Sequence, residues 1–171
     1  IGSVTATLTA AEAYAVGQAL ASGATTIYGV TVMGVVESFA GTGLSGSNNS
    51  IFLTAGAGGE KFQLYFGYVA VSNWSQVSAI GVTVSVYGKI QNYNNTAFEL
   101  VNISSINVVD TDALAVDQFV EDFMHPEISY ENYADTGACL GEDGYYDAAK
   151  QAFNVLSAAQ RQMFVENSNY T

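Results

Sequence analysis

The stretch that decides the fold is residues 80–101, IGVTVSVYGKIQNYNNTAFELV. Apolar and polar residues alternate along it, and alternate residues of a strand point to opposite faces of a sheet. The face predicted to be buried consists of Val82, Val84, Val86 and Ile90, and the opposite face consists of Thr83, Ser85, Tyr87, Lys89 and Gln91. Asn94 and Asn95 adopt positive φ at low cost, so the pattern predicts two strands joined by a tight turn, with the second resuming at residues 97–100.

One helix and three strands are predicted before this hairpin. Thr9 and Glu12 have the spacing of a capping box at a helix N-terminus. The helix is expected to end at Gly23 and to carry an apolar stripe made of Ala13, Val16, Ala19 and Leu20. Runs rich in β-branched and aromatic residues predict strands over residues 27–39, 50–55 and 60–68. The first strand is long and is expected to bend at Gly29 or Gly34, and residues 72–78 form a bridge to the hairpin.

These elements, taken in order, resemble an OB-fold barrel, which has five strands and a bridge between the third and the fourth. Three segments also resemble a group of exported bacterial OB-fold-like domains: Ala11-Glu12-Ala13, VSVYGKIQNY at residues 84–93, and Phe98-Glu99-Leu100. The resemblance covers residues 9–109. It implies a mainly β protein with a five-stranded, OB-fold-like Greek-key barrel after one helix. Members of the group are mostly uncharacterised or non-catalytic, so the resemblance implies little about activity.

The composition changes near Asp110, and the change predicts a domain boundary. Residues 1–109 carry a net charge of −2, whereas residues 110–171 carry −10. The second segment reads as an acidic helical appendage, with helices over residues 112–124 and 145–156 and a third helix after a capping box at Ser157 and Gln160. It resembles helical appendages that follow other exported bacterial domains. We therefore expect two domains, residues 1–109 and 110–171.

The net charge and the amino-acid composition of the chain favour some molecular partners and cellular locations over others. A net charge of −12 repels phosphate backbones, which argues against nucleic-acid binding. Charged residues make up 12% of the chain, about half the usual share, which suits a subunit packed against its neighbours or a glycosylated extracellular protein. No apolar run has the length of a membrane span, and the start at Ile1 is interpreted as a mature terminus after signal removal or an artificial boundary. Glycosylation sequons that would suit a secreted or cell-surface protein occur at Asn48, Asn73, Asn94, Asn102 and Asn169.

Three motifs carry candidate chemistry, each with a structural alternative. Residues 41–46, GTGLSG, match a dinucleotide-binding pattern, but a strand is predicted next where a helix is required, so we interpret them as a hairpin loop. His125 and Cys139 could form a nucleophilic pair, although His125 is more simply a helix C-cap. Calcium could bind at a cluster of carboxylates, in which Asp143 is equally suited to be an N-cap: Asp135, Glu142, Asp143 and Asp147. The same carboxylates could form a glycosidase pair, but the sequence does not fix their separation.

The candidate binding or interface residues are Tyr65, Trp74, Tyr87, Lys89 and Tyr93. Several of them fall on the side of their strands away from the core, and OB-folds commonly bind oligosaccharides or oligonucleotides there by stacking. The alternative is that these rings pack under the C-terminal helices or against a neighbouring subunit.

The favoured interpretation is a non-catalytic structural subunit of an extracellular or cell-surface assembly, which self-associates into an oligomer, filament or surface layer. It rests on the low charge, the polar-aromatic strand faces and the lack of a catalytic motif in the sequence. The alternative is a secreted carbohydrate- or ligand-binding module that uses the aromatic outer face, and a hydrolase ranks last. No cofactor beyond the candidate calcium is implied.

Overall fold

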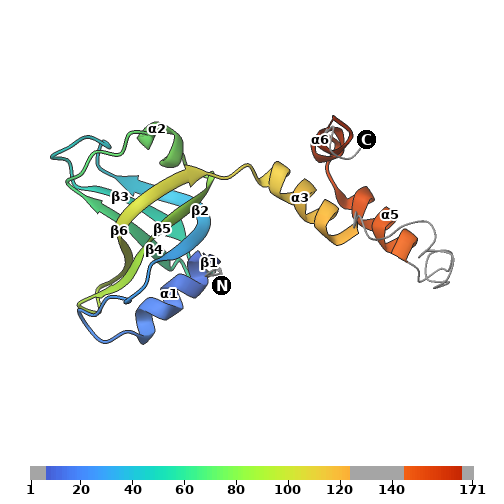
Figure 1. Ribbon diagram of the computed structural model, residues 1–171. Helices are drawn as coiled ribbons and strands as arrows, with labels where there is room; N and C mark the ends of the chain where they lie inside the picture. The colour runs from blue at the N-terminus through green and yellow to red at the C-terminus, as the bar shows by residue number, and fades with distance from the viewer. Residues whose placement is uncertain (1–6, 124–144, 167–171) are drawn as a thin grey trace. The chain divides into compact units, whose positions relative to one another are not determined.

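The computed structural model describes residues 7–123 and 145–166 (Figure 1). The chain divides into two compact units between Val109 and Asp110. Its described part is mainly β, with one six-stranded mixed sheet and five helices. The first unit contains β1 (Thr7–Thr9), α1 (Ala10–Ala19), β2 (Val30–Ala40), β3 (Asn49–Thr54), β4 (Lys61–Gly67), α2 (Trp74–Val77), β5 (Thr83–Tyr93) and β6 (Ala97–Val108). The second contains α3 (Thr111–Phe123), α5 (Tyr145–Val155) and α6 (Ala158–Glu166).

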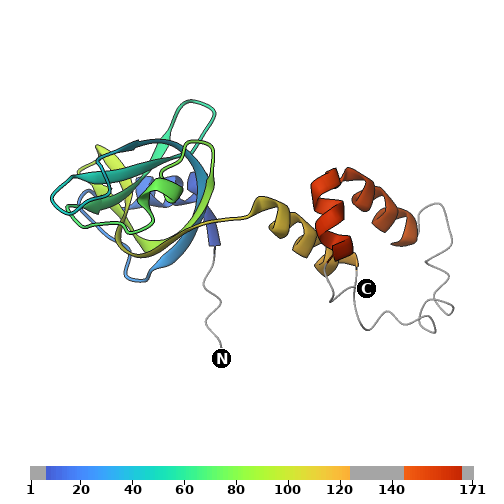
Figure 2. The ribbon, with the colours of Figure 1, turned by 90° about the horizontal axis from the view of Figure 1, so that it is seen from above.

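The strands of the first unit are hydrogen-bonded into a closed ring. Their order is β1-β2-β3-β4-β6-β5, and β5 also pairs with β2. The long strand β2 makes this closure possible, because Val30 to Val35 pair with β5 while Val36 to Ala40 pair with β3. A register shift between Val36 and Ser38 marks the place where the strand changes partner. Figures 1 and 2 show α1 at one end of the ring and α2 at the other.

The interior of the ring is filled by alternate residues of its strands, as the sequence pattern predicts. Val84, Val86 and Ile90 of β5 are buried, whereas Tyr87 between them is exposed. Asn94 and Asn95 both have positive φ, 52° and 59°, which confirms the predicted turn of the hairpin. The fully buried apolar side chains that the other strands contribute are Val32, Val36, Ile51, Leu53, Phe62, Leu64 and Leu100.

Helix α1 differs from the prediction in its length and in its buried face. The capping box of Thr9 and Glu12 is present, but the helix ends at Ala19, before the expected stop at Gly23. The helix buries the small residues Ala10, Ala13 and Gly17, and leaves Val16 exposed. Small residues face the sheet because the backbones approach closely: a Cβ added at Gly17 would lie 2.8 Å from the Cβ of Phe98. The short strand β1, parallel to β2, was not predicted.

The second unit is held by a cluster of phenylalanines. Phe119 of α3 contacts Phe123, Phe153 of α5 and Phe164 of α6, with ring centroids 5.4 to 5.8 Å apart. The predicted capping box at α6 is present, since Gln160 N donates to Ser157 Oγ and Ser157 N donates to Gln160 Oε1. A side-chain hydrogen bond of 2.9 Å from Gln160 to Asp112 ties α6 to α3.

Asn92 is a buried polar residue that joins the hairpin to the loop after α1. Its amide nitrogen donates to Leu20 O at 2.8 Å and to Asn95 Oδ1 at 2.9 Å, and its amide oxygen accepts from Asn95 N at 2.8 Å. The backbone of Asn92 also pairs with Gly23 and Ala24. Because the side chain is only 1% exposed, water cannot replace these bonds.

We therefore expect Asn92→Ala to lower the free energy of unfolding by about 2–4 kcal/mol, since it leaves two backbone groups, Leu20 O and Asn95 N, without their side-chain partner. Urea denaturation followed by circular dichroism measures the change. The matched control is Asn107→Ala on β6, an exposed asparagine, which should shift the free energy by less than about 0.5 kcal/mol. Equal midpoints for the two variants would contradict the role given to Asn92.

Candidate functional site

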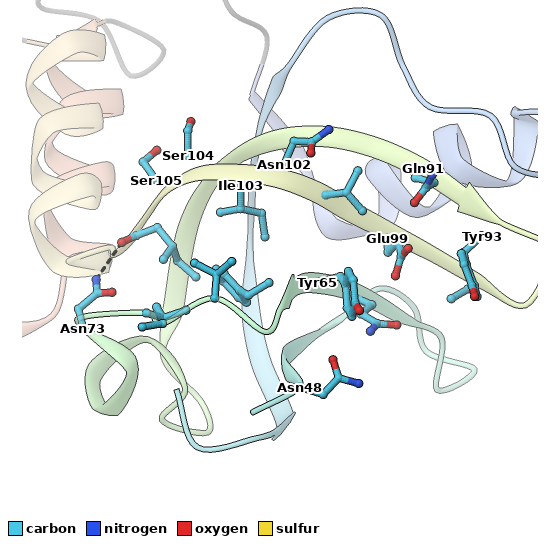
Figure 3. Close-up of a pocket in the computed structure, with 18 of the residues that line it drawn as sticks. Asn48, Tyr65, Asn73, Gln91, Tyr93, Glu99, Asn102, Ile103, Ser104 and Ser105 are labelled. Carbon is cyan, nitrogen blue, oxygen red and sulfur yellow. Dashed lines mark hydrogen bonds between the residues drawn. The ribbon is translucent and has the colours of Figure 1, made fainter. Parts of the chain in front are cut away.

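The candidate site is a groove in the first unit, where β4 and β6 separate. These two parallel strands pair only at Gln63↔Glu99 and Leu64↔Leu100. Beyond that contact they diverge, and a groove of about 1040 Å³ opens between them (Figure 3). Its walls are Phe66 and residues 69–73 on one side and residues 101–107 of β6 on the other. A volume at the upper end of the range for ligand pockets accommodates a drug-sized molecule or a short segment of a polymer.

A bulge in β6 shapes the wall of the groove. Tyr87↔Ser105 and Lys89↔Val101 are paired, so residues 102–104 stand opposite the single residue Gly88. Asn102 has a φ of 52°, a conformation that asparagine tolerates better than most residues. Asn73, at the start of α2, donates from its side chain to Ile106 O at 2.9 Å. This bond satisfies a backbone carbonyl of β6 at a point where β4 no longer pairs with that strand.

Glu99 lies on the floor of the groove and is the one charged residue among the described residues that line it. It is 5% exposed, and Gln91 of β5 and Gln63 of β4 are its direct cross-strand neighbours. Desolvation by burial raises the pKa of the Glu99 carboxyl above its ordinary value. The floor is therefore a row of three polar side chains that share one face.

Two of the sequence-predicted residues meet at this groove. Tyr65 stands two residues beyond Gln63 on β4, and Tyr93 stands two residues beyond Gln91 on β5. Because β4 and β5 run in opposite directions relative to each other, the two rings lie on opposite sides of Glu99 along the strands. Tyr93 is a diagonal neighbour of Glu99 across the antiparallel β5–β6 pair, and such neighbours are about 7–8 Å apart, within reach of an aromatic side chain.

The other three predicted residues do not line the groove. Trp74 is half-buried and packs edge-on against Phe39 and Phe66, with ring centroids 5.9 and 6.2 Å away. Tyr87 lies over Gly29, where an added Cβ would clash with its ring. Lys89 is half-buried opposite Val101.

The remaining motifs of the sequence fall as follows. Residues 41–46 lie in the loop between β2 and β3, with a strand next, as expected of a hairpin loop. His125, Cys139, Asp135, Glu142 and Asp143 lie outside the described residues, and Asp147 falls in α5. No group of three metal-ligating side chains occurs in the described part of the chain.

The predicted sequons differ in their surroundings. Asn48, Asn94 and Asn102 are exposed, and Asn48 and Asn102 line the groove. Asn73 is half-buried, and its amide nitrogen, the atom that would carry a glycan, already donates to Ile106 O. Asn169 lies outside the described residues.

Sequence reasoning missed the row of Gln63, Gln91 and Glu99. The alternation predicts that Gln91 lies on the outer face of its strand, and it includes Glu99 only as part of a strand motif. Gln91 and Glu99 pair within the hairpin, 8 positions apart, but Gln63 joins them only through the pairing of β4 with β6, 36 positions from Glu99, which leaves no local pattern.

Comparisons with known proteins identify no family. No family model matches the chain, and no curated protein matches it. One matching solved structure is described as "OBody AM1L10 bound to hen egg-white lysozyme"; it is 19% identical, covers 64% of this chain and 98% of that chain, and has a TM-score of 0.44. A likeness of this size is not evidence for a function. In the described residues, no helix combines the length and the apolar character that crossing a membrane requires.

The raised pKa of Glu99 has a consequence for stability. The folded state binds the proton more tightly than the unfolded state, whose reference value is 4.5. As the pH rises from 4.5 through the folded pKa, the unfolded state therefore holds fewer protons, and the free energy of unfolding falls. The cost is fully present at neutral pH, where the folded state must bury the charge.

Glu99→Gln should therefore raise the melting temperature at about pH 7, and the gain should shrink at about pH 4, where the wild-type carboxyl is mainly protonated in both states. Differential scanning calorimetry at the two pH values measures both differences. Glu60→Gln, an exposed glutamate in a turn, serves as the control and should show no such gain at neutral pH. A Glu99→Gln gain that is the same at both pH values would contradict a buried charge.

Proposed function

We propose that this protein is a non-catalytic carbohydrate-binding module, and that its ring of strands is an OB-type barrel with an acidic helical appendage. The observation that carries the function is the lining of the groove: two tyrosine rings on either side of a row of amide and carboxyl groups, with no cation among the described lining residues. The OB-type assignment is supported by five strands that close into a ring, a long first strand shared between two neighbours, and a short helix before β5.

The chemistry of the groove suits a sugar chain. A pyranose presents flat faces of C–H groups that pack on aromatic rings, and hydroxyl groups that bond to amides and carboxylates. Tyr65 and Tyr93 supply the rings, and Asn48, Gln63 and Asn102 are among the polar groups around them. A phosphate backbone would meet Glu99 and no compensating cation, which disfavours nucleic acid.

The same lining supports a binding role without catalysis. Glycoside hydrolysis ordinarily uses two carboxyl groups about 5–9.5 Å apart. Glu99 is the single carboxyl group among the described residues of the groove. We also propose that the module acts outside the cell or at its surface, because it resembles exported bacterial domains and exposes sequon asparagines at Asn48, Asn94 and Asn102.

Substitution of the two rings tests the binding role. Tyr65→Ala and Tyr93→Ala should each raise the Kd for a glycan identified on an array about tenfold, because a ring contact contributes about 1.4 kcal/mol. Titration calorimetry measures the change. Tyr28→Ala is the matched control, since Tyr28 is 81% exposed and lies outside the groove. Binding that survives both groove substitutions, or that never appears on the array, would reject the proposal.

A second candidate function, self-assembly, is favoured by an exposed apolar patch on two adjoining loops. The rim patch consists of Leu44, Tyr68 and Val69, which are 67%, 62% and 68% exposed. Hydrogen bonds hold the two loops side by side, since Asn49 Nδ2 donates to both Leu44 O and Val69 O. Large apolar side chains gathered on ordered loops are typical of contact surfaces, and we propose a second copy of this chain as the occupant, because its low content of charged residues suits packing against a neighbour.

Light scattering tests this second function. The 171-residue chain should form particles whose mass is a multiple of 18.0 kDa, and Leu44→Ser with Val69→Ser should return the mass to 18.0 kDa. Ile80→Ser, at a side chain 71% exposed elsewhere in the same unit, should leave the oligomer intact. A mass of 18.0 kDa at all protein concentrations would exclude self-assembly.

A further inference from the structure

The carboxylate of Glu99 is buried and has no partner in the described part of the protein. The residue is 95% buried, and its oxygens accept no hydrogen bond and join no ion pair there. No fully buried side-chain oxygen or nitrogen of the described residues lacks a hydrogen bond, so the unpaired oxygens of Glu99 must reach the space of the groove. Figure 3 shows the carboxyl end of Glu99 directed into that space. An unpaired, nearly buried charge is costly, and a ligand that pairs with it recovers that cost.

The groups beside Glu99 offer mainly acceptors to the groove. Gln63 donates from its amide nitrogen to Ser50 Oγ, and Gln91 donates to Thr25 Oγ1, each at 3.0 Å. Their amide oxygens accept no hydrogen bond from the described residues. Each of the two amide nitrogens keeps one further N–H, so the row Gln63–Glu99–Gln91 offers four oxygen acceptors that no described residue uses, against two remaining donors.

An acceptor-rich floor is matched by a group that only donates. A protonated primary amine has three N–H donors, no lone pair and a positive charge, whereas a hydroxyl has one donor and two lone pairs that would face the acceptors. The rings of Tyr65 and Tyr93, on opposite sides of Glu99, are placed to add a cation–π attraction. No cation occurs among the described residues that line the groove: Lys61 pairs with Glu37 at 3.0 Å, and Lys89 does not line it.

We propose that Glu99 recognises a protonated primary amine on the bound carbohydrate, so that the groove prefers glycans with free amino sugars to their N-acetylated forms. This inference rests on the proposed carbohydrate-binding function and deepens it. Glu99 sets specificity in this role, while Tyr65 and Tyr93 contribute to the binding of either form. N-acetylation removes the charge and two of the three donors, and adds an acceptor that faces the carboxylate.

Titration calorimetry with two oligosaccharides of equal length tests the proposal, using the full chain at about pH 6, where a primary amine is protonated. One ligand is a glucosamine tetramer and the other is an N-acetylglucosamine tetramer. The glucosamine tetramer should bind at least about tenfold more tightly, in the range seen for hydrogen bonds to charged groups. Its affinity should also fall as salt is raised, because salt screens the attraction between the ammonium groups of the approaching ligand and the Glu99 carboxylate.

Three variants separate specificity from binding. Glu99→Gln should abolish the preference and the salt dependence while leaving the affinity for the N-acetylated tetramer within about twofold. Tyr65→Ala should weaken both ligands, and the control Glu60→Gln should change neither. Circular dichroism of Glu99→Gln checks that the fold is retained, so that a lost preference is not a lost structure.

The outcomes distinguish this inference from the function on which it rests. Equal or tighter binding of the N-acetylated tetramer, or a preference that persists in Glu99→Gln, overturns amine recognition and leaves carbohydrate binding in place. If neither tetramer binds and a lysine-rich peptide is captured instead, both the carbohydrate-binding function and the recognition of an amino sugar are overturned, because the amine would then belong to a protein ligand.

Discussion

The first unit depends on a two-residue contact between parallel strands. Gln63↔Glu99 and Leu64↔Leu100 are the whole of the pairing between β4 and β6, yet without it the sheet would be open. Leu64 and Leu100 are fully buried at this point, so the closure is held by packing as well as by backbone hydrogen bonds. The same contact places Gln63 and Glu99 on the outer side of the ring, which means that the closure of the fold and the floor of the groove are one feature.

Two buried asparagines hold the loops at either end of this architecture. Asn92 binds the turn of the hairpin to the loop after α1, and Asn49 binds the loop between β2 and β3 to the one that follows β4. In each case a single amide satisfies several loop backbone groups that have no place in a strand ladder. The two residues differ in what they position: Asn92 acts on the edge of the core, whereas Asn49 fixes a wall of the groove and the rim patch beside it.

The sequence predicts the features of this fold that depend on residues close together in the chain, and it misses those that depend on residues far apart. The hairpin was readable because Val84, Val86 and Ile90 alternate with polar residues, and the turn because Asn94 and Asn95 accept positive φ. Helix α1 was readable at its capped start but not at its buried face, since a close approach to Phe98 selects Gly17 over the larger Val16. Tyr65 and Tyr93 were singled out by residue type, whereas Gln63 comes beside Glu99 only through the long-range pairing of β4 with β6.

The burial of Glu99 is better explained by a requirement of the groove than by a requirement of the fold. A residue at this position on the closing contact could be apolar without loss of the hydrogen bonds of the ladder, which come from the backbone. With a carboxyl group here, burial raises the pKa of Glu99, and no described residue donates a hydrogen bond to its oxygens. Residues that destabilise the folded state are expected at functional sites, because the free energy lost in folding is regained when a ligand binds. The amide nitrogens of Gln63 and Gln91 donate to Ser50 and Thr25. The ligand group that would best offset the cost of burying the Glu99 charge is therefore one that brings hydrogen-bond donors and a positive charge.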